Sequence, residues 1–231
     1  MIGSPRHHFD SIGSTNAYAR ELAAQGATPG TVVTSAEQTE GRGRQGRAWS
    51  TPAGKALAWS AIVPLEGDVP GLFPLRAGLA ACEAVEVLGG GPAEVKWPND
   101  VMLDGRKCAG VLVEGRPQDG WAVVGVGINL TIEPDEFPPE VRDRAISVGS
   151  GATLDTATEA LNVALTRWLA SPDSEVLAEL ARRDHLAGRE VSWEGGAGVA
   201  SGIAPDGSLV VISPDGGTNH LHAGEVHLTP A

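Results

Sequence analysis

The residues of this chain best suited to chemistry lie in one short stretch, Gly41-Arg42-Gly43-Arg44-Gln45-Gly46-Arg47-Ala48-Trp49. This arginine loop concentrates arginine and glycine in a protein whose formal net charge is −12. Glycine has no Cβ, so backbone N–H groups can come close to phosphate oxygens. Guanidinium groups donate paired, permanently charged hydrogen bonds to phosphate or carboxylate. The loop therefore predicts a binding site for an anion.

Residues 41–46 also spell G-x-G-x-x-G, the pattern of dinucleotide-binding folds. That pattern requires a strand before it and a helix that begins within it. Here the following residues predict a loop that leads into a strand at 55–63. The motifs that accompany a kinase glycine loop, V-A-I-K, H-R-D and D-F-G, do not follow either. We therefore reject both of these folds, and a solvated loop rich in glycine and arginine stays open as the alternative.

Three further motifs carry groups that could meet the same anion. Lys96-Trp97-Pro98-Asn99-Asp100 places a lysine and a polar corner beside a strand end, although in isolation it is more readily an ordinary β-turn. Lys107 begins a strand that reads K-x-x-G-V-L-x-E, and a lone lysine at a strand start is usually a surface residue. Gly125-Val126-Gly127-Ile128-Asn129 has two glycines within an apolar strand, which suggests the close approach of a ligand or of another backbone.

Small polar residues precede the first predicted helix. Gly13-Ser14-Thr15-Asn16 supplies N-cap residues for a helix that runs to about Ala24, and a strand at 31–38 delivers Gln38 to the start of the arginine loop. Capping alone is a sufficient explanation for these residues. A helix N-terminus also presents free N–H groups, so the same residues could face a ligand.

The spacing of apolar residues divides the chain into two parts. It predicts helices at 72–88, 153–169 and 173–185, and turn signals divide 93–130 into a meander of antiparallel strands. After Gly188, short strands alternate with Pro-Asp-Gly turns, which predicts a small β-barrel that is too short to bury a core alone. We therefore expect the barrel to pack on the larger part. We place the domains at 1–186 and 187–231.

Composition argues against several classes of function. A pI near 4.9 is unsuited to a general binder of nucleic acid or anionic membranes. No apolar run approaches the roughly 20 residues of a transmembrane helix, and the N-terminus lacks a signal-peptide core. Cys82 and Cys108 lack C-x-x-C spacing, so we expect two buried thiols in a reducing compartment. These features predict a cytoplasmic protein without nucleic-acid or membrane partners.

His220, His222 and His227 have no Cys or carboxylate cluster at ligand spacing, so we expect no structural metal site.

Taken in order, G-R-G-R-x-G-R-x-W, K-W-P-N-D, K-x-x-G-V-L-x-E and G-x-G-I-N resemble the motifs of the biotin–protein ligases, over about residues 8–130. The resemblance implies an α+β fold: a class II aminoacyl-tRNA synthetase-like mixed sheet with flanking helices, followed by a small SH3-like β-barrel. It also implies a two-step reaction. Biotin and ATP, with Mg²⁺, give biotinyl-5′-AMP and pyrophosphate. A lysine of a biotin carboxyl carrier protein, a subunit of acetyl-CoA or acyl-CoA carboxylase, then takes the biotinyl group. The motifs begin at about residue 10, so we expect the short form without an N-terminal DNA-binding domain.

The family's functional residues can be carried over position by position. The resemblance implies catalytic roles for Lys107 and Arg44, which would offset the charge that develops when the biotin carboxylate attacks the α-phosphorus. Trp49 would stack on adenine, although an aromatic residue at a loop end packs into the core at least as often. The residues implied to contact biotin or biotinyl-AMP are Ser14, Thr15, Asn16, Gln38, Gly41, Arg42, Gly43, Arg44, Lys107 and Gly110. Those implied for ATP, adenine and support of the site are Arg47, Trp49, Lys96, Asn99, Asp100 and Asn129.

Two other functions stay open on the sequence alone. The nearest is a lipoate or octanoate ligase or transferase of the same fold, and the arginine loop favours biotin because its pattern belongs to the biotin side of the resemblance. The other is a non-enzymatic regulator that senses biotinyl-AMP or binds DNA, and the acidic composition counts against DNA binding. The motifs do not specify the state of assembly, for which a homodimer is one option.

Overall fold

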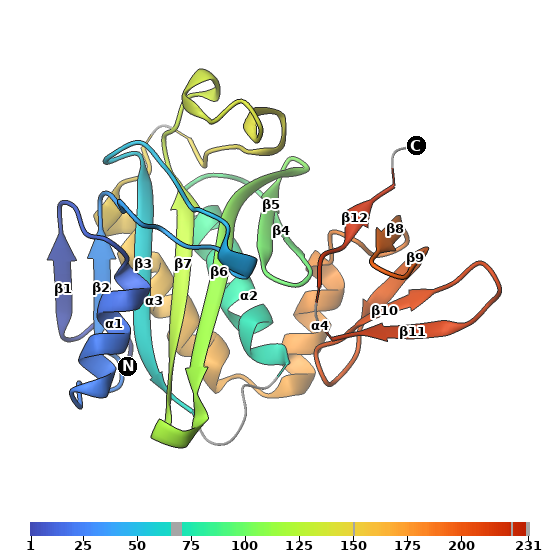
Figure 1. The fold of residues 1–231 in the computed structure, drawn as a ribbon, viewed down its shortest axis with the longest axis horizontal. Coiled ribbons are helices and arrows are strands. Elements are labelled where there is room, and N and C mark those ends of the chain that lie inside the picture. Colours follow the sequence, from blue (N-terminus) through green and yellow to red (C-terminus); the bar gives the residue numbers. More distant parts are fainter. Residues whose placement is uncertain (66–70, 150, 223, 230–231) are drawn as a thin grey trace.

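The computed structural model describes residues 1–65, 71–149, 151–222 and 224–229. Over these residues the chain forms a seven-stranded sheet, a five-stranded sheet and four α-helices (Figure 1). The large sheet has the order β1-β2-β3-β7-β6-β5-β4. In it β1 and β2 are parallel, and every other neighbouring pair is antiparallel. Its strands are β1 (Arg6–Phe9), β2 (Val32–Ser35), β3 (Ala56–Pro64), β4 (Ala93–Lys96), β5 (Asp100–Leu103), β6 (Arg106–Arg116) and β7 (Trp121–Asn129).

The predicted antiparallel meander is confirmed as strands β4 to β7. The turn between β5 and β6 has positive φ at Asp104 and Gly105, 49° and 71°, and these residue types tolerate that conformation. β6 and β7 pair over most of their length, and this register brings Gly110 opposite Gly127. Two positions without side chains therefore lie next to each other in the middle of the sheet.

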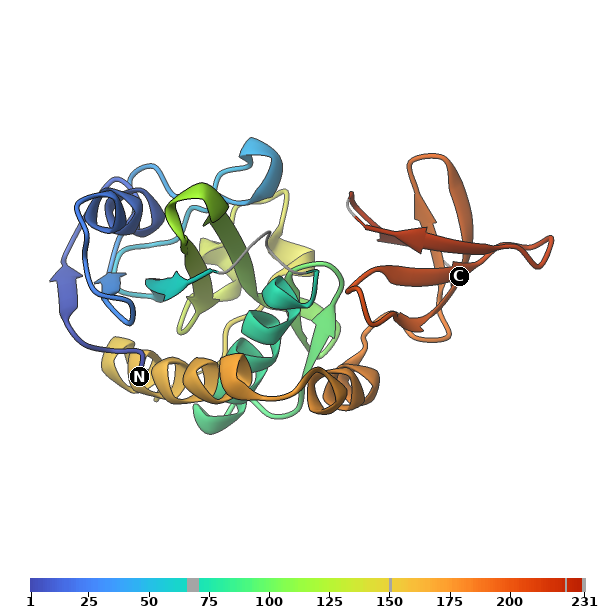
Figure 2. The same ribbon diagram turned by 90° about the horizontal axis from the view of Figure 1, so that it is seen from below.

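The predicted helices are present with small changes at their ends. Ser14 caps the first helix, since its Oγ accepts from the N–H of Ala17 at 3.4 Å. The helices are α1 (Thr15–Ala24), α2 (Leu72–Val87), α3 (Leu154–Ala170) and α4 (Asp173–Arg183). Figure 2 shows α1 on one side of the large sheet and α2 and α3 on the other.

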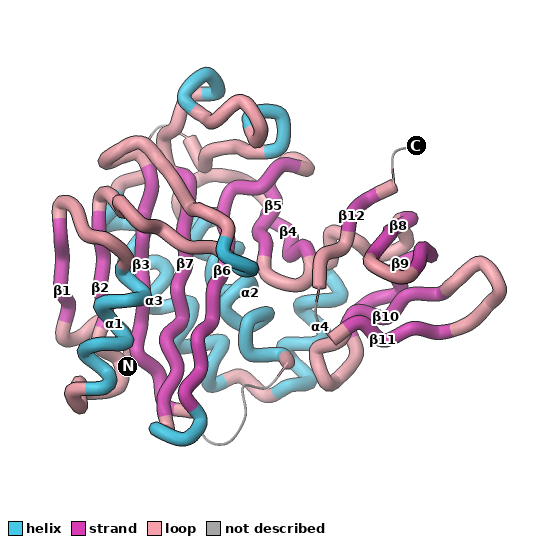
Figure 3. Tube along the Cα trace, in the orientation of Figure 1, coloured by secondary structure: helices cyan, strands magenta, loops and turns pink. Residues whose placement is uncertain are grey.

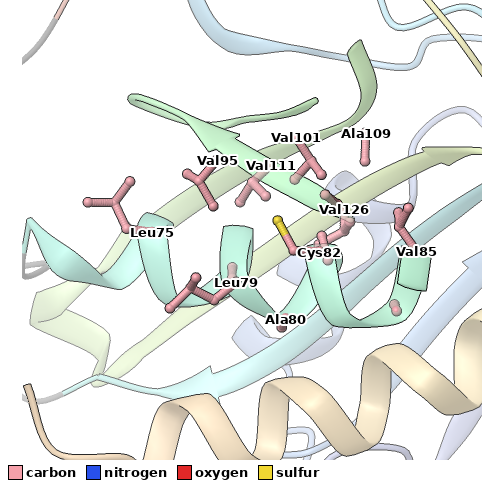
Figure 4. Packing of buried hydrophobic residues seen from close by; sticks show 14 of the residues in the cluster. Leu75, Leu79, Ala80, Cys82, Val85, Val95, Val101, Ala109, Val111 and Val126 are labelled. Atoms are coloured by element: carbon pink, nitrogen blue, oxygen red, sulfur yellow. The ribbon is translucent and has the colours of Figure 1, made fainter. Parts of the chain in front are cut away.

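Alternation along the strands decides which face each helix covers. Val124 and Val126 of β7 belong to the main hydrophobic core with α2 and α3, and Figure 4 shows Cys82 of α2 pointing toward Val126, with Leu75 and Leu79 in the same cluster. The alternate residues of β7, Val123 and Gly125, face the opposite side, where α1 packs chiefly on β2, β3 and β7. The remainder of that face is available to the loops.

The second sheet has the order β11-β10-β9-β8-β12. It packs on the larger part as expected, because Val191 and Leu209 belong to the same hydrophobic core. The indole N–H of Trp97 donates to the carbonyl of Gly207 at 3.0 Å, which fixes a turn of the second sheet against the end of β4. Its strands are β8 (Glu190–Trp193), β9 (Gly196–Ile203), β10 (Leu209–Ile212), β11 (Thr218–Leu221) and β12 (His227–Leu228). The two sheets confirm the predicted α+β fold, and the domain boundary after residue 186 stays a proposal.

Two further expectations concern the chain as a whole. Cys82 and Cys108 are free and buried, and burial raises the pKa of both thiols, to about 12 for Cys108. Within the described ranges, no helix has the length and apolar character needed to cross a membrane.

Candidate functional site

A cleft of about 700 Å³ lies on the face of the large sheet that carries α1. This volume is in the usual range for small-molecule sites. Figure 3 shows loops in front of the sheet and above the upper ends of β3, β7 and β6, and Figure 1 shows the arginine loop crossing in front of β7 and β6. The sequence-predicted residues that line the cleft are Ser14, Thr15, Asn16, Gln38, Arg42, Gly43, Arg44, Arg47, Trp49, Lys96, Asn99, Asp100, Lys107, Gly110 and Asn129.

The missing side chains of the glycine motif make room for the groups that line the cleft. A Cβ on Gly125 would come within 2.1 Å of Asn16 Oδ1, and a Cβ on Gly127 would come within 2.6 Å of the Trp49 ring. Both distances are far below van der Waals contact. The side chain of Asn129, two residues further along β7, donates to the carbonyl of Ile146 at 3.1 Å. Three successive cleft-facing positions of β7 therefore have different surroundings. Gly125 lies against Asn16, Gly127 lies against Trp49, and the third position is Asn129 itself.

The wall of the cleft around Asn16 is made of uncharged polar side chains. Ser14, Thr15 and Asn16 are almost fully buried. Gln38 Oε1 accepts from the backbone N–H of Thr15 at 2.8 Å and lies 3.1 Å from its Oγ1, so the loop entry and the helix N-terminus are joined. This neutral end suits the uncharged polar part of a ligand.

The other end gathers three cationic side chains. Lys107 Nζ lies 2.6 Å from Asp100 Oδ1, and Arg44 Nη1 donates to Asn99 Oδ1 at 3.2 Å. Burial holds the pKa of the Arg44 guanidinium below its ordinary value. Asp100 opposes this shift, and Arg47 adds to it. Burial likewise lowers the pKa of Lys96. An anion placed here would relieve both effects, because it would favour the charged form of each group.

Trp49 lies between the two ends. Its ring covers the glycine positions of β6 and β7, and Lys107 Nζ is 5.5 Å from the ring centroid. The indole N–H is buried and has no hydrogen-bond partner among the described residues. A broad aromatic surface beside a lysine is suited to a flat, electron-rich ring such as adenine.

The arginine loop is closed by its own backbone. The N–H of Trp49 donates to the carbonyl of Gly41 at 2.9 Å, and the N–H of Gly43 donates to the carbonyl of Arg47 at 2.7 Å. Gly41 is the one predicted residue that is not among the described lining residues. A Cβ there would come within 2.2 Å of the Trp49 carbonyl, so this glycine allows the loop to close. Arg47 forms an ion pair with Glu225, which lies just before β12.

Sequence reasoning missed two groups of lining residues. Phe137, Glu140 and Arg144 come from the segment after β7, and Glu225 and His227 come from the second sheet. A 3₁₀ turn at Pro134–Glu136 forms part of the first segment. Arg144 could have been predicted as a site residue, because it is a cation that follows the last motif closely. No local pattern in the sequence predicts that residues near β12 lie at the cleft.

The model of the Biotin/lipoate A/B protein ligase family matches residues 8–130. A protein of Bacillus spizizenii named bifunctional ligase/repressor BirA is 35% identical over 166 residues, which are 68% of this chain and 50% of that protein. The chain thus spans about half the length of this relative. The biotin–[acetyl-CoA-carboxylase] ligase of Paracoccus denitrificans is 33% identical over 226 residues, 88% of this chain and 92% of that protein.

Solved structures match almost the entire chain. The biotin protein ligase of Aquifex aeolicus in complex with biotin and ATP has a TM-score of 0.81 and 26% identity, over 99% of this chain and 100% of that one. A mutant of the same ligase in complex with biotin has a TM-score of 0.83 and 26% identity, over 98% of each chain.

Proposed function

The chain belongs to the Biotin/lipoate A/B protein ligase family, and from this premise we propose that it is an ATP-dependent biotin–protein ligase. The relatives named above support biotin, and the structure with biotin and ATP supports the pair of substrates. The observation that carries the proposal is the cleft itself, which has a neutral polar end, an aromatic centre and a cationic end.

In the first step, the biotin carboxylate attacks the α-phosphorus of ATP. A bond forms between the carboxylate oxygen and phosphorus, the bond to the β-phosphate oxygen breaks, and pyrophosphate leaves with its electron pair. Two anions must approach each other for this to happen. Lys107, Arg44 and Lys96 reduce the repulsion and stabilise the additional charge in the transition state. Arg42 and Gly43 contribute further donors from the loop.

ATP enters as its magnesium complex. Asp100 is the residue that would hold the metal, because it lies at the cationic end and offers a carboxylate oxygen, the ligand type that Mg²⁺ prefers. Mg²⁺ would supply charge stabilisation at the phosphates. Trp49 would stack on the adenine ring, and Asn99, Asn129 and Arg47 would support the site.

In the second step, a lysine amine of a carrier protein attacks the carbonyl carbon of biotinyl-5′-AMP. The amide bond forms, the mixed anhydride bond breaks, AMP leaves with the electron pair of that bond, and the attacking nitrogen releases one proton. The amine must be neutral to attack. We propose that the acceptor is a biotin carboxyl carrier protein of an acetyl-CoA or acyl-CoA carboxylase, since the relative from Paracoccus denitrificans bears that name.

Lipoate or octanoate is the competing substrate class within the family. Their non-carboxylate ends are a dithiolane or a methyl group, which form no strong hydrogen bonds. The hydrogen-bonding capacity that Ser14, Thr15 and Gln38 do not use within the protein would then face an apolar group, at a cost in affinity. The cyclic urea of biotin has two N–H donors and a carbonyl, and it fits this end of the cleft better.

Pyrophosphate release tests the first step. The protein is incubated with MgATP and one of biotin, lipoate or octanoate, without any carrier. We expect release with biotin and background release with the other acids. Release with lipoate or octanoate but not with biotin would refute the assignment.

A further inference from the structure

Side-chain amines are scarce in this chain. Only three of its 17 lysine and arginine residues are lysines, Lys55, Lys96 and Lys107. A guanidinium stays protonated, whereas a lysine amine can lose its proton and attack a carbonyl carbon. A protein that produces an acyl adenylate can therefore be acylated by it at any accessible lysine. The surroundings of these three lysines decide where that can happen.

Two of the three lysines lie within the cleft. Lys96 and Lys107 are lining residues, and Lys107 is paired with Asp100. Bound biotinyl-5′-AMP would place its phosphate at this cationic end. A phosphate oxygen that accepts from an ammonium keeps the ammonium protonated, and it also opposes the burial that lowers the pKa of Lys96. An ammonium has no lone pair with which to attack, so the phosphate protects these two lysines.

Lys55 lies just outside the cleft. It is not among the described lining residues, although the chain around it borders the cleft. The next residue, Ala56, pairs with Asn129 of β7, and Asn129 lines the cleft. The carbonyl of Lys55 accepts from the N–H groups of Leu130 and Thr131, at 2.9 and 3.0 Å. An adenylate that leaves the cleft on this side therefore comes close to Lys55.

A carboxylate holds the Lys55 ammonium. Lys55 Nζ donates to both carboxylate oxygens of Glu136, at 2.5 and 2.6 Å. Glu136 Oε2 also accepts from the N–H of Glu133 at 2.9 Å, and Phe137, the next residue, is buried and lines the cleft. Hydrogen bonds from Lys55 and then from Glu133 lower the pKa of Glu136. An ionised carboxylate is thus fixed beside Lys55 at the border of the cleft.

We propose that Lys55 is a self-biotinylation site of this protein and that Glu136 limits its modification. The neutral amine of Lys55 attacks the carbonyl carbon of biotinyl-5′-AMP. A C–N bond forms, the C–O bond of the mixed anhydride breaks, AMP leaves with the electron pair of that bond, and the nitrogen releases one proton. Attack requires an amine that has lost its proton and separated from Glu136, so the ion pair lowers the reactive fraction. The inference rests on the proposed function, which supplies the adenylate.

The protection should be partial. About a third of each side chain is exposed, 36% for Lys55 and 32% for Glu136, and exposed ion pairs are weak. We therefore expect Glu136 to change the rate of modification several-fold rather than to abolish it. Biotinylation would in turn remove the charge of Lys55, and with it the contact that joins the start of β3 to the segment after β7.

The test uses three variants and no carrier protein. Glu136→Gln keeps the size of the side chain and an oxygen for the N–H of Glu133, but it has no charge. Asp135→Asn is the matched control, because it removes a carboxylate from the preceding exposed position and leaves the ion pair intact. Lys55→Arg keeps a cation for Glu136 and removes the amine. Thermal unfolding checks that each variant is folded.

Each protein is incubated in two ways, with MgATP and biotin or with added biotinyl-5′-AMP. Peptide mapping by mass spectrometry measures the biotin on Lys55, which in the first arm is divided by the pyrophosphate released. We expect several-fold more biotin on Lys55 in Glu136→Gln than in the wild type and Asp135→Asn. In Lys55→Arg, the peptide that contains position 55 should gain no biotin.

The arm with added biotinyl-5′-AMP decides the inference, because it does not depend on adenylate synthesis. A folded Glu136→Gln protein with no more biotin on Lys55 than the wild type in that arm would overturn the inference. An equal increase in Asp135→Asn would overturn it as well, since any lost carboxylate would then suffice. A wild type that releases no pyrophosphate with biotin would refute the proposed function instead, and the added adenylate would still test Lys55.

Discussion

Lys107 is the residue at which the separate motifs meet. Its ammonium lies 2.6 Å from the carboxylate of Asp100 and 5.5 Å from the centre of the Trp49 ring. A Cβ on Gly110 would come within 3.2 Å of the lysine side chain, so the glycine of the same motif leaves space for it. The alternative of a lone surface lysine does not describe this position, because a third of its side chain is exposed and that part lies in the cleft.

Replacement of this lysine should affect chemistry rather than stability. We expect Lys107→Ala to slow adenylate formation by about 2 to 4 kcal/mol of transition-state stabilisation, since one charge-assisted contact to the reacting groups is lost. Single-turnover pyrophosphate release measures the effect. Arg106→Ala is the control, because it removes a cation from the preceding position of β6, which is not among the described lining residues. Equal rates for both variants would show that Lys107 has no specific role.

Arg44 should contribute most to the retention of biotinyl-5′-AMP after this intermediate has formed. It joins the arginine loop to Asn99, so Arg44→Gly removes a charged anchor and adds a flexible residue. We expect biotinyl-5′-AMP to escape faster and to label exposed amines of an unrelated lysine-rich protein in the same tube. Western blotting for biotin on that bystander measures the escape. An unlabelled bystander, with adenylate synthesis intact, would show that Arg44 does not retain the intermediate.

At the scale of elements, the middle of β7 and β6 supports the aromatic residue of the loop. Gly110 and Gly127 are paired across the two strands, and the ring of Trp49 lies over both. The sequence predicted close approach at the glycines of β7. It could not identify Trp49 as the neighbour, because the loop and the strand are about 80 residues apart and meet only through the strand order.

A methyl group under the indole ring should weaken ATP binding. Gly127→Ala would place a Cβ within 2.6 Å of Trp49, so the ring must move. We expect KM for ATP to rise by roughly tenfold, the value of one lost stacking contact, with a smaller change in KM for biotin. Gly13→Ala is the control, because no atom lies within 4 Å of a Cβ there. An unchanged KM for ATP in folded Gly127→Ala would contradict the assignment of Trp49 to adenine.

Local patterns predicted most of the elements for simple reasons. Apolar spacing located α2, capping residues located the start of α1, and Asp104-Gly105 located a tight turn. The neighbours of β3 could not be predicted in this way, since it pairs with β2 on one side and with β7 on the other. The contacts of Ser60 with Thr15 and Asn16 depend on that order, and this is why motif reasoning missed Ser60.

At the scale of the whole molecule, α4 connects the core to the second sheet. Arg183 is buried and pairs with Glu86 of α2 and Glu179 of α4, and it donates to the carbonyl of Ala93 at 3.0 Å. The chain just before β12 returns to the cleft at Glu225. Stability of this junction and assembly of the site are therefore linked.

Low pH should destabilise the ion pairs by which Arg183 joins α4 to α2. Hydrogen bonds from Arg182 and then Arg183 lower the pKa of Glu179 from 4.5 to about 2. A carboxylate with a lowered pKa stabilises the folded state above the unfolded pKa, and this stabilisation is lost as the pH falls from about 4.5 to about 2.

We expect the free energy of unfolding of Glu179→Gln to be below that of the wild type at neutral pH and to approach it toward pH 2, about the lowered pKa. Urea titrations at several pH values measure this. Glu175→Gln, an exposed change on the same helix, should follow the wild type. A constant difference between wild type and Glu179→Gln across the acid range would refute the ionic contribution.

The central claim is that this chain attaches biotin to a carrier lysine. The most direct measurement mixes the protein with MgATP, biotin and a purified biotin carboxyl carrier domain, and follows the intact mass of that domain. We predict a gain of one biotinyl group, located on a single lysine by peptide mapping, and no gain when lipoate replaces biotin or when the acceptor lysine is changed to arginine. A carrier that stays unmodified with biotin, or one that gains a lipoyl group instead, would contradict the account.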